Sequence, residues 1–167
     1  GYIVLYFQDV VGAAAAIGGL VLAGTQLTGS AARIGAGSLA DRLSGVRGAA
    51  TVALGQIAVA AVLFTILTLE PESLLTSVAL FLGLGLSIHG STGIYYSCLT
   101  GLVETDELGA ASAGGQTAIN LGGITTPPLF GYLVQTTGYY SGWAILAVMT
   151  AIATILLFIV RRRVSPL

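Results

Sequence analysis

Long stretches of this chain carry no formal charge, and their lengths constrain the fold more than any other feature of the sequence. Four long uncharged runs cover residues 10–32, 48–69, 73–103 and 108–160. The hydrocarbon core of a bilayer is about 30 Å thick, and a helix needs roughly 20 apolar residues to cross it. Each of the first three runs therefore fits one crossing. The fourth run fits two crossings, separated by the polar and aromatic segment 135–140.

The crossings are expected to be helices. Backbone groups in hydrocarbon must be satisfied within a helix or a closed barrel, and these runs lack the alternating pattern of barrel strands. We therefore predict an all-α, polytopic transmembrane helix bundle. The five predicted spans cover about residues 12–40, 48–69, 74–103, 108–135 and 140–160. Residues 1–8 are apolar but too short to span, and because the chain begins with Gly we expect them to be the tail of a truncated helix.

The composition excludes several classes of protein. Only 8% of the residues are charged, whereas soluble domains carry about 25%. A water-soluble globule is therefore excluded, and so is a disordered chain, which needs low hydrophobicity and high charge. A net charge of −1 offers no electrostatic surface for nucleic acid. The chain has one His, one Cys and no Lys, so we expect no metal site, no cofactor, and no ATP motor with a phosphate-binding lysine loop.

The arginines predict which side of the membrane each end of the bundle faces. Arg42 and Arg47 follow the first predicted span, and residues 161–163, all Arg, follow the fifth. Because four spans lie between the two groups, both lie on one side, which the positive-inside rule makes the cytoplasmic side. The sequence thus predicts an integral protein of the cell (plasma or inner) membrane with a cytoplasmic C-terminus. At the outer interface, where amphipathic rings concentrate, we expect Tyr139, Tyr140 and Trp143.

Small residues recur every four positions in two of the predicted spans, a spacing that lets helix backbones approach closely in lipid. The two stripes are Gly24, Thr28, Ala32, Ala36 and Ala40 in the first span, and Ala110, Gly114, Ala118 and Gly122 in the fourth. Four glycines between positions 83 and 93 weaken the third helix, and Pro127 and Pro128 are expected to kink the fourth. Bendable helices of this kind favour a protein that changes shape over a static anchor.

The segment 37–47, Gly-Ser-Leu-Ala-Asp-Arg-Leu-Ser-Gly-Val-Arg, connects the first two predicted spans. It resembles the Gly-x-x-x-Asp-Arg-x-Gly-x-Arg signature of the major facilitator superfamily (MFS), with one extra residue before the second glycine. Residues 109–140, with their Gly, Asn and Pro-Pro positions, resemble helix eleven of that family and its outer loop, and the basic residues 161–163 resemble the tail after helix twelve. The resemblance implies the C-terminal half of a twelve-helix transporter, from the end of helix seven through helix twelve.

The resemblance implies a cytoplasmic gate built on this signature. Asp41 and Arg42, together with Gly37 and Arg47, would form a latch that holds the two halves of the transporter together. The alternative is a charge pair in a loop that only sets the topology. Arg33 is the one charge well inside a span, and it lies two helical steps of four residues before Asp41. It would either join the gate network or extend its head group to the membrane interface.

The resemblance also implies a central cavity lined by helices seven, eight, ten and eleven. The candidates for lining it are polar residues inside the predicted spans, namely Gln26, His89, Tyr95, Gln116 and Asn120. The alternative for each is a hydrogen bond between helices. The only histidine, His89, would also be able to take part in proton coupling, the alternative being a purely structural hydrogen bond.

The implied function is secondary transport of a small solute by alternating access, in which two six-helix halves rock around a site at the membrane midplane. The expected partners are the lipid bilayer, the N-terminal six-helix half, the small-molecule substrate and a coupling ion. A non-transporting receptor or scaffold is the alternative. An intramembrane enzyme using His89 and Ser91 is a remote alternative, because residues this close on a helix do not face each other, and we expect no catalytic residue.

Overall fold

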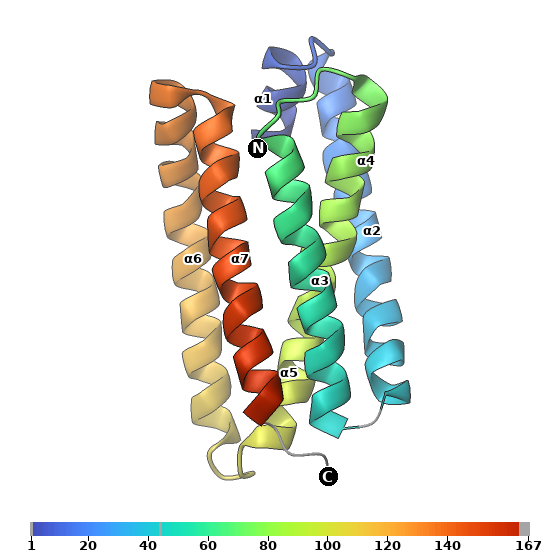
Figure 1. Ribbon diagram of the computed structural model, residues 1–167, viewed down its shortest axis with the longest axis vertical. Helices are drawn as coiled ribbons and strands as arrows, with labels where there is room; N and C mark the ends of the chain where they lie inside the picture. Colours follow the sequence, from blue (N-terminus) through green and yellow to red (C-terminus); the bar gives the residue numbers. More distant parts are fainter. Residues whose placement is uncertain (1, 44, 164–167) are drawn as a thin grey trace.

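The computed structural model describes residues 2–43 and 45–163, and these residues form a bundle of helices with no β-strand among them (Figure 1). The elements are α1 (Tyr2–Asp9), α2 (Ala15–Arg42), α3 (Gly45–Leu67), α4 (Leu74–Leu84), η1 (Gly85–His89), α5 (Gly90–Leu102), α6 (Leu108–Thr137) and α7 (Tyr139–Arg163). The elements α4, η1 and α5 follow one another without a break, and η1 is a wider, π-helical turn within them. The prediction of an all-α fold is confirmed.

Four helices are long and apolar enough to cross a membrane: Ala15–Arg42, Gly45–Leu67, Leu74–Leu102 and Tyr139–Arg162, with mean hydropathies from 1.2 to 2.6. They agree with four of the five predicted spans to within three residues at each end. The helix α6 is also long enough, at 30 residues, and it has no charged side chain. Its many Gly, Thr, Gln and Asn residues leave it less apolar, and it is not among the four helices found in the described part of the chain.

The helix α6 continues through Pro127 and Pro128 without ending, and the expected kink at these residues stays a prediction. The hydroxyl of Tyr2 donates a hydrogen bond of 2.7 Å to the carbonyl oxygen of Pro127, which joins α1 to α6. The predicted stripe of small residues on α6 is exposed over its whole length rather than packed against another described helix. The exposed positions are Ala110, Gly114, Ala118 and Gly122.

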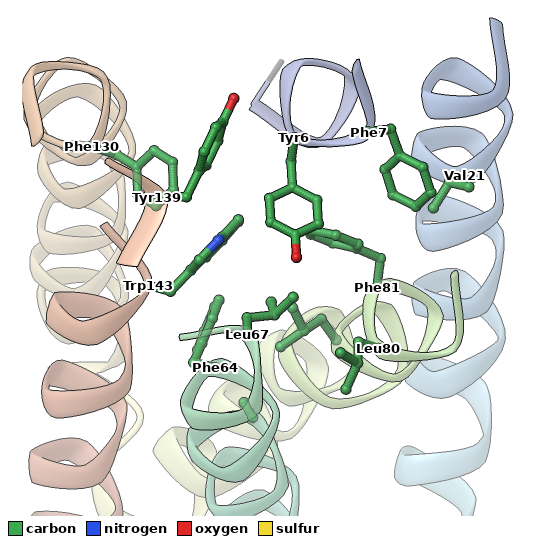
Figure 2. Close-up of a cluster of buried hydrophobic side chains, with 12 residues drawn as sticks. Tyr6, Phe7, Val21, Phe64, Leu67, Leu80, Phe81, Phe130, Tyr139 and Trp143 are labelled. Carbon is green, nitrogen blue, oxygen red and sulfur yellow. The ribbon is translucent and has the colours of Figure 1, made fainter. Parts of the chain in front are cut away.

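An aromatic core holds together the end of the bundle where α1 lies. Figure 2 shows Tyr6 pointing from α1 between Trp143 of α7 and Phe81 of α4, and their ring centroids are 5.7 and 5.5 Å from that of Tyr6. Trp143 also lies against Phe130 of α6, at 4.7 Å, and against Phe64 of α3, at 6.1 Å. Each such ring pair contributes about 0.5–1.5 kcal/mol beyond the burial of its surface. This core therefore fixes α1, α3, α4, α6 and α7 relative to one another.

Two of the three aromatic residues predicted for the outer interface are buried between helices, and their depth in the membrane stays a prediction. Tyr139 and Trp143 are only 7% and 4% exposed, because they point into the aromatic core, whereas Tyr140 is 59% exposed. At the same end of the bundle the hydroxyl of Tyr139 donates a hydrogen bond of 2.7 Å to Asp9 Oδ2. Glu70 Oε1 accepts a bond of 2.7 Å from the backbone N–H of Tyr140, in the first turn of α7. A carboxylate is favourable at a helix N-terminus. These two hydrogen bonds join the start of α7 to the end of α1 and to the loop between α3 and α4.

The opposite half of the bundle packs on small side chains. A second core joins α2, α3 and α5 and consists of Ala36, Ala40, Ala49, Val52, Ala53 and Ile94, all buried. Ala36 and Ala40 belong to the small-residue stripe predicted for the first span, so this part of the packing prediction is confirmed. Small side chains let helix backbones come close together but provide little apolar surface.

Candidate functional site

The π-helical turn η1 packs directly against the middle of α2. A Cβ atom at Gly29 would lie 2.6 Å from the Cβ of His89, and a Cβ atom at Gly85 would collide with the backbone oxygen of Thr25. Glycine at both positions therefore lets the two backbones approach more closely than other residues allow. The glycines at 83, 85 and 90 also lower the helix propensity of this segment, which favours a departure from regular α-helix here.

Four side chains from α2 and α3 donate hydrogen bonds to backbone carbonyls around η1, and we call these four donors the polar seam. A π-helical turn changes the spacing of the helical hydrogen bonds, and carbonyls in such an irregular segment need other donors. The hydroxyls of Thr25 and Thr28 each share one proton between a carbonyl of α2 (Val21 at 2.8 Å, Thr25 at 3.1 Å) and a carbonyl of α4 (Phe81 at 3.4 Å, Leu82 at 3.2 Å). Gln56 donates to Leu86 (3.4 Å) and Arg33 to His89 (3.0 Å). The donors thus hold η1 in place from two neighbouring helices.

The polar seam brings together two residues that the sequence assigned to different sites. The guanidinium Nε of Arg33 donates to the backbone oxygen of His89, so Arg33 lies beside a cavity candidate and forms no ion pair with Asp41. The Nδ1 atom of His89 and the Oε1 atom of Gln56 are buried and have no hydrogen-bond partner among the described residues. Sequence reasoning missed Gln56. The group of glycines at 83–93 was the signal that pointed to this segment.

A second polar group joins α5 to α6. The hydroxyl of Tyr96 donates to Gln116 Oε1 at 2.6 Å, and Gln116 Nε2 donates to Asn120 Oδ1 at 3.0 Å. The ring of Tyr95 lies beside this chain, and a Cβ atom at Gly115 would collide with its hydroxyl. Tyr96 donates its hydroxyl proton to Gln116, and Gln116 donates one amide N–H to Asn120. The amide N–H donors of Asn120 are therefore the last groups in this chain of hydrogen bonds.

The other cavity candidate, Gln26, lies apart from both groups. It is exposed on α2, and its backbone oxygen accepts a hydrogen bond of 2.9 Å from Ser30 Oγ. The structure thus brings Gln116 and Asn120 together, places Tyr95 beside them and His89 in the polar seam, and leaves Gln26 alone on its own helix face.

The signature residues lie around the turn between α2 and α3. Gly45 begins α3 with a φ of 62°, a left-handed conformation that favours glycine. Asp41 lines a small groove of about 360 Å³ between this turn and the end of α5, near Gly101. Within residues 2–43 and 45–163, no ion pair joins Asp41, Arg42 or Arg47 to another residue. Gly37 is half-buried, and the space at its Cβ position is open.

Comparison with known proteins decides the family. A family model described as the Major Facilitator Superfamily matches residues 1–167, the full length of the chain. The chain belongs to the Major Facilitator Superfamily. No curated protein and no solved structure matches the chain.

Membership in the Major Facilitator Superfamily, together with the four apolar helices, makes this chain an integral membrane protein of a family of transporters. Proteins of this superfamily are in general not enzymes. The described residues contain no group of three or more His, Cys, Asp or Glu side chains that could hold a metal ion. The donors of the polar seam are used by carbonyls around η1, whereas the Tyr96–Gln116–Asn120 chain ends in N–H donors that could bond to a polar molecule.

Proposed function

We propose that this chain is the C-terminal half of an MFS transporter for a small solute. In this assignment α1 is the end of helix seven, and α2, α3, α4–η1–α5, α6 and α7 are helices eight to twelve. The family match over residues 1–167 carries the proposal. The signature at 37–47, which connects α2 to α3, supports the assignment of these two helices as eight and nine.

The helix α6 is the fifth membrane span in this proposal, and one of its faces lines the solute pathway. Gln116 and Asn120 are exposed on this helix, together with its stripe of small residues. Polar side chains inside a membrane protein face the bundle interior or a water-filled cavity rather than lipid. The low apolar content of α6 follows from this role, and the N-terminal half of the transporter covers the other side of the cavity.

Alternating access moves the two halves around a solute held near the midplane. The amide N–H groups of Asn120, at the end of the hydrogen-bonded chain, bind an acceptor oxygen of the solute, and His89 and Tyr95 contribute to the same wall. The signature end faces the cytoplasm, as its arginines favour, and Asp41 and Arg42 pair with the other half when the cytoplasmic side closes. A gradient of a coupling ion or of the solute supplies the energy.

Uptake by the complete transporter tests this proposal. The chain is joined to its N-terminal half, reconstituted into proteoliposomes, and assayed for gradient-driven uptake of a panel of sugars, amino acids and organic acids. We expect Asp41→Asn to reduce uptake with unchanged expression, because the latch loses its charge. Asp106→Asn, in the exposed loop between α5 and α6, is the matched control and should leave uptake unchanged. Equal uptake by both variants would show that Asp41 does not act as a latch.

Labelling of Cys98 distinguishes a transporter from a receptor or scaffold. The Cys98 side chain is half-buried, and its Sγ atom lies 4.0 Å from the backbone oxygen of Val46, near the signature end. Opening and closing of this end changes the access of a membrane-impermeant thiol reagent to Cys98. We expect the labelling rate to change when a transported solute is added. A rate that no solute in the panel changes, together with no uptake, would favour the scaffold.

A further inference from the structure

An open groove of about 600 Å³ runs between α2 and α3, with η1 and the end of α4 at its deep end. Its walls are apolar, with Leu39 and Leu43 on α2 and Val59 on α3. Its floor is low because Gly35 and Gly55 have no side chains, and a Cβ atom at either position would meet nothing within 4 Å. The groove is therefore an apolar space that no described side chain fills.

The length of this groove matches one leaflet of a bilayer. Along α2 it extends from Ala32 to Leu43, which is eleven steps along the helix or about 16 Å at 1.5 Å per residue. Half of the hydrocarbon core is about 15 Å. Both walls belong to helices that are apolar enough to span the membrane. With α2 and α3 across a bilayer and Leu43 at its surface, the other end of the groove would lie near the midplane.

The surface end of the groove is positively charged. Thr51 lines this end, and its hydroxyl accepts a hydrogen bond of 2.8 Å from Nε of Arg161 at the end of α7. Arg42 and Arg47, both exposed, flank the turn from α2 to α3 beside Leu43. The nearest acidic side chain in the sequence, Asp41, lines the separate groove toward the end of α5. Further acidic residues at this end lie in the loop between α5 and α6, at 104–107.

We propose that this groove binds one acyl chain of an anionic phospholipid from the leaflet at the arginine-rich end. The acyl chain lies along α2 and α3 toward η1, and the phosphate lies among Arg161, Arg42 and Arg47. Basic residues at the ends of membrane helices attract anionic head groups, and the apolar walls exclude a polar ligand. The inference requires only that α2 and α3 span a bilayer, so it does not depend on whether the protein transports a solute.

Native mass spectrometry of the full-length protein, released from micelles, tests the proposal. The protein is first equilibrated with equal amounts of phosphatidylglycerol and phosphatidylcholine that carry the same two acyl chains. We expect wild-type protein to retain phosphatidylglycerol about fivefold or more over phosphatidylcholine. Equal retention of the two lipids, or of neither, would overturn the proposal.

Variants that fill the groove distinguish lipid bound in the groove from lipid bound elsewhere on the protein surface. Gly35→Leu and Gly55→Leu place a side chain in the open space, and each should reduce retained phosphatidylglycerol about tenfold. Gly19→Leu is the matched control, because Gly19 is also on α2 with nothing near its Cβ position but does not line the groove. Loss of lipid in all three variants, or in none, contradicts the assigned site.

Two further measurements keep the test independent of how well these variants fold. Arg161→Gln should lower the preference for phosphatidylglycerol over phosphatidylcholine about fivefold, since one arginine near the surface contributes roughly 1 kcal/mol. A phosphatidylglycerol with a photoreactive group in mid-chain should label wild-type peptides from 32–43 and 51–59. Labelling confined to other helices, or occupation of the groove by another helix of the assembled protein, would refute the proposal.

Discussion

Replacing Gly29 by alanine tests the close approach of α2 and η1. The new Cβ atom would lie 2.6 Å from the Cβ of His89, 2.9 Å from its Cγ and 3.2 Å from the backbone oxygen of Gly85. Carbon atoms pack best at about 3.5–4.0 Å, so η1 has to move away from α2 by about 1 Å. That movement also stretches the hydrogen bond of 3.0 Å between Arg33 Nε and the His89 oxygen.

The expected cost follows from two opposing effects. Alanine in place of glycine within a helix stabilises by roughly 0.5–1 kcal/mol, because the unfolded chain is less free. Overpacking destabilises by about 1–3 kcal/mol, and the upper part of that range applies because a backbone atom is among the obstacles. Gly35→Ala, on the same helix but with nothing within 4 Å of its Cβ position, gains the first effect alone. Because both variants gain the first effect, they should differ by the overpacking alone, about 2–3 kcal/mol.

The single tryptophan provides the assay. Trp143 is buried in the aromatic core, so its fluorescence reports the unfolding of the bundle in detergent, and both variants can be compared with wild type by thermal unfolding. We expect Gly35→Ala to unfold at or above the wild-type temperature and Gly29→Ala below it. If the two variants unfold within 0.5 kcal/mol of each other, roughly the error of such comparisons, the close contact of η1 with α2 is refuted.

Two further predictions concern the end of the bundle that holds the aromatic core. Tyr139→Phe removes the hydrogen bond to the carboxylate of Asp9 and should destabilise by about 1.5–3 kcal/mol; a double-mutant cycle with Asp9→Ala, which removes the acceptor, measures this coupling, and additive effects would contradict it. Phe130→Ala should cost about 3–5 kcal/mol, because Phe130 is 4% exposed, whereas Leu129→Ala, at a position 46% exposed, should change the unfolding free energy by less than about 0.5 kcal/mol. Similar losses in both alanine variants would argue against the packing shown in Figure 2.

The two ends of the bundle are built differently, and the difference bears on the proposed motion. The aromatic core and the bonds of Tyr139 and Glu70 hold the end that contains α1. At the signature end the described helices meet through small residues, and Asp41 and Arg42 have no ionic partner among the described residues. Charged groups that are not paired within one half are available for pairing with the other half. This arrangement fits a half that moves as a unit and closes through its signature end.

The sequence by itself determined the class of fold and the positions of the helices. Uncharged runs of the length of a bilayer crossing leave few alternatives to helices, and the four spans found at 15–42, 45–67, 74–102 and 139–162 follow from that. The turn between α2 and α3 was also predictable, because the segment 37–47 that resembles the family signature marks it. These features depend on local composition and length, which can be read along the chain.

Only the tertiary structure decided which faces of the helices meet. Hydropathy does not predict that Tyr139 and Trp143 point into the aromatic core, since an aromatic ring suits the membrane interface and a protein core equally well. Nor does spacing show that Arg33 bonds to the backbone of His89, because that contact needs the π-helical turn and the glycines that let α2 approach it. The stripe on α6 has the composition of a packed face, and its exposure depends on which helices are its neighbours. Such contacts join residues far apart in the sequence, so no local pattern encodes them.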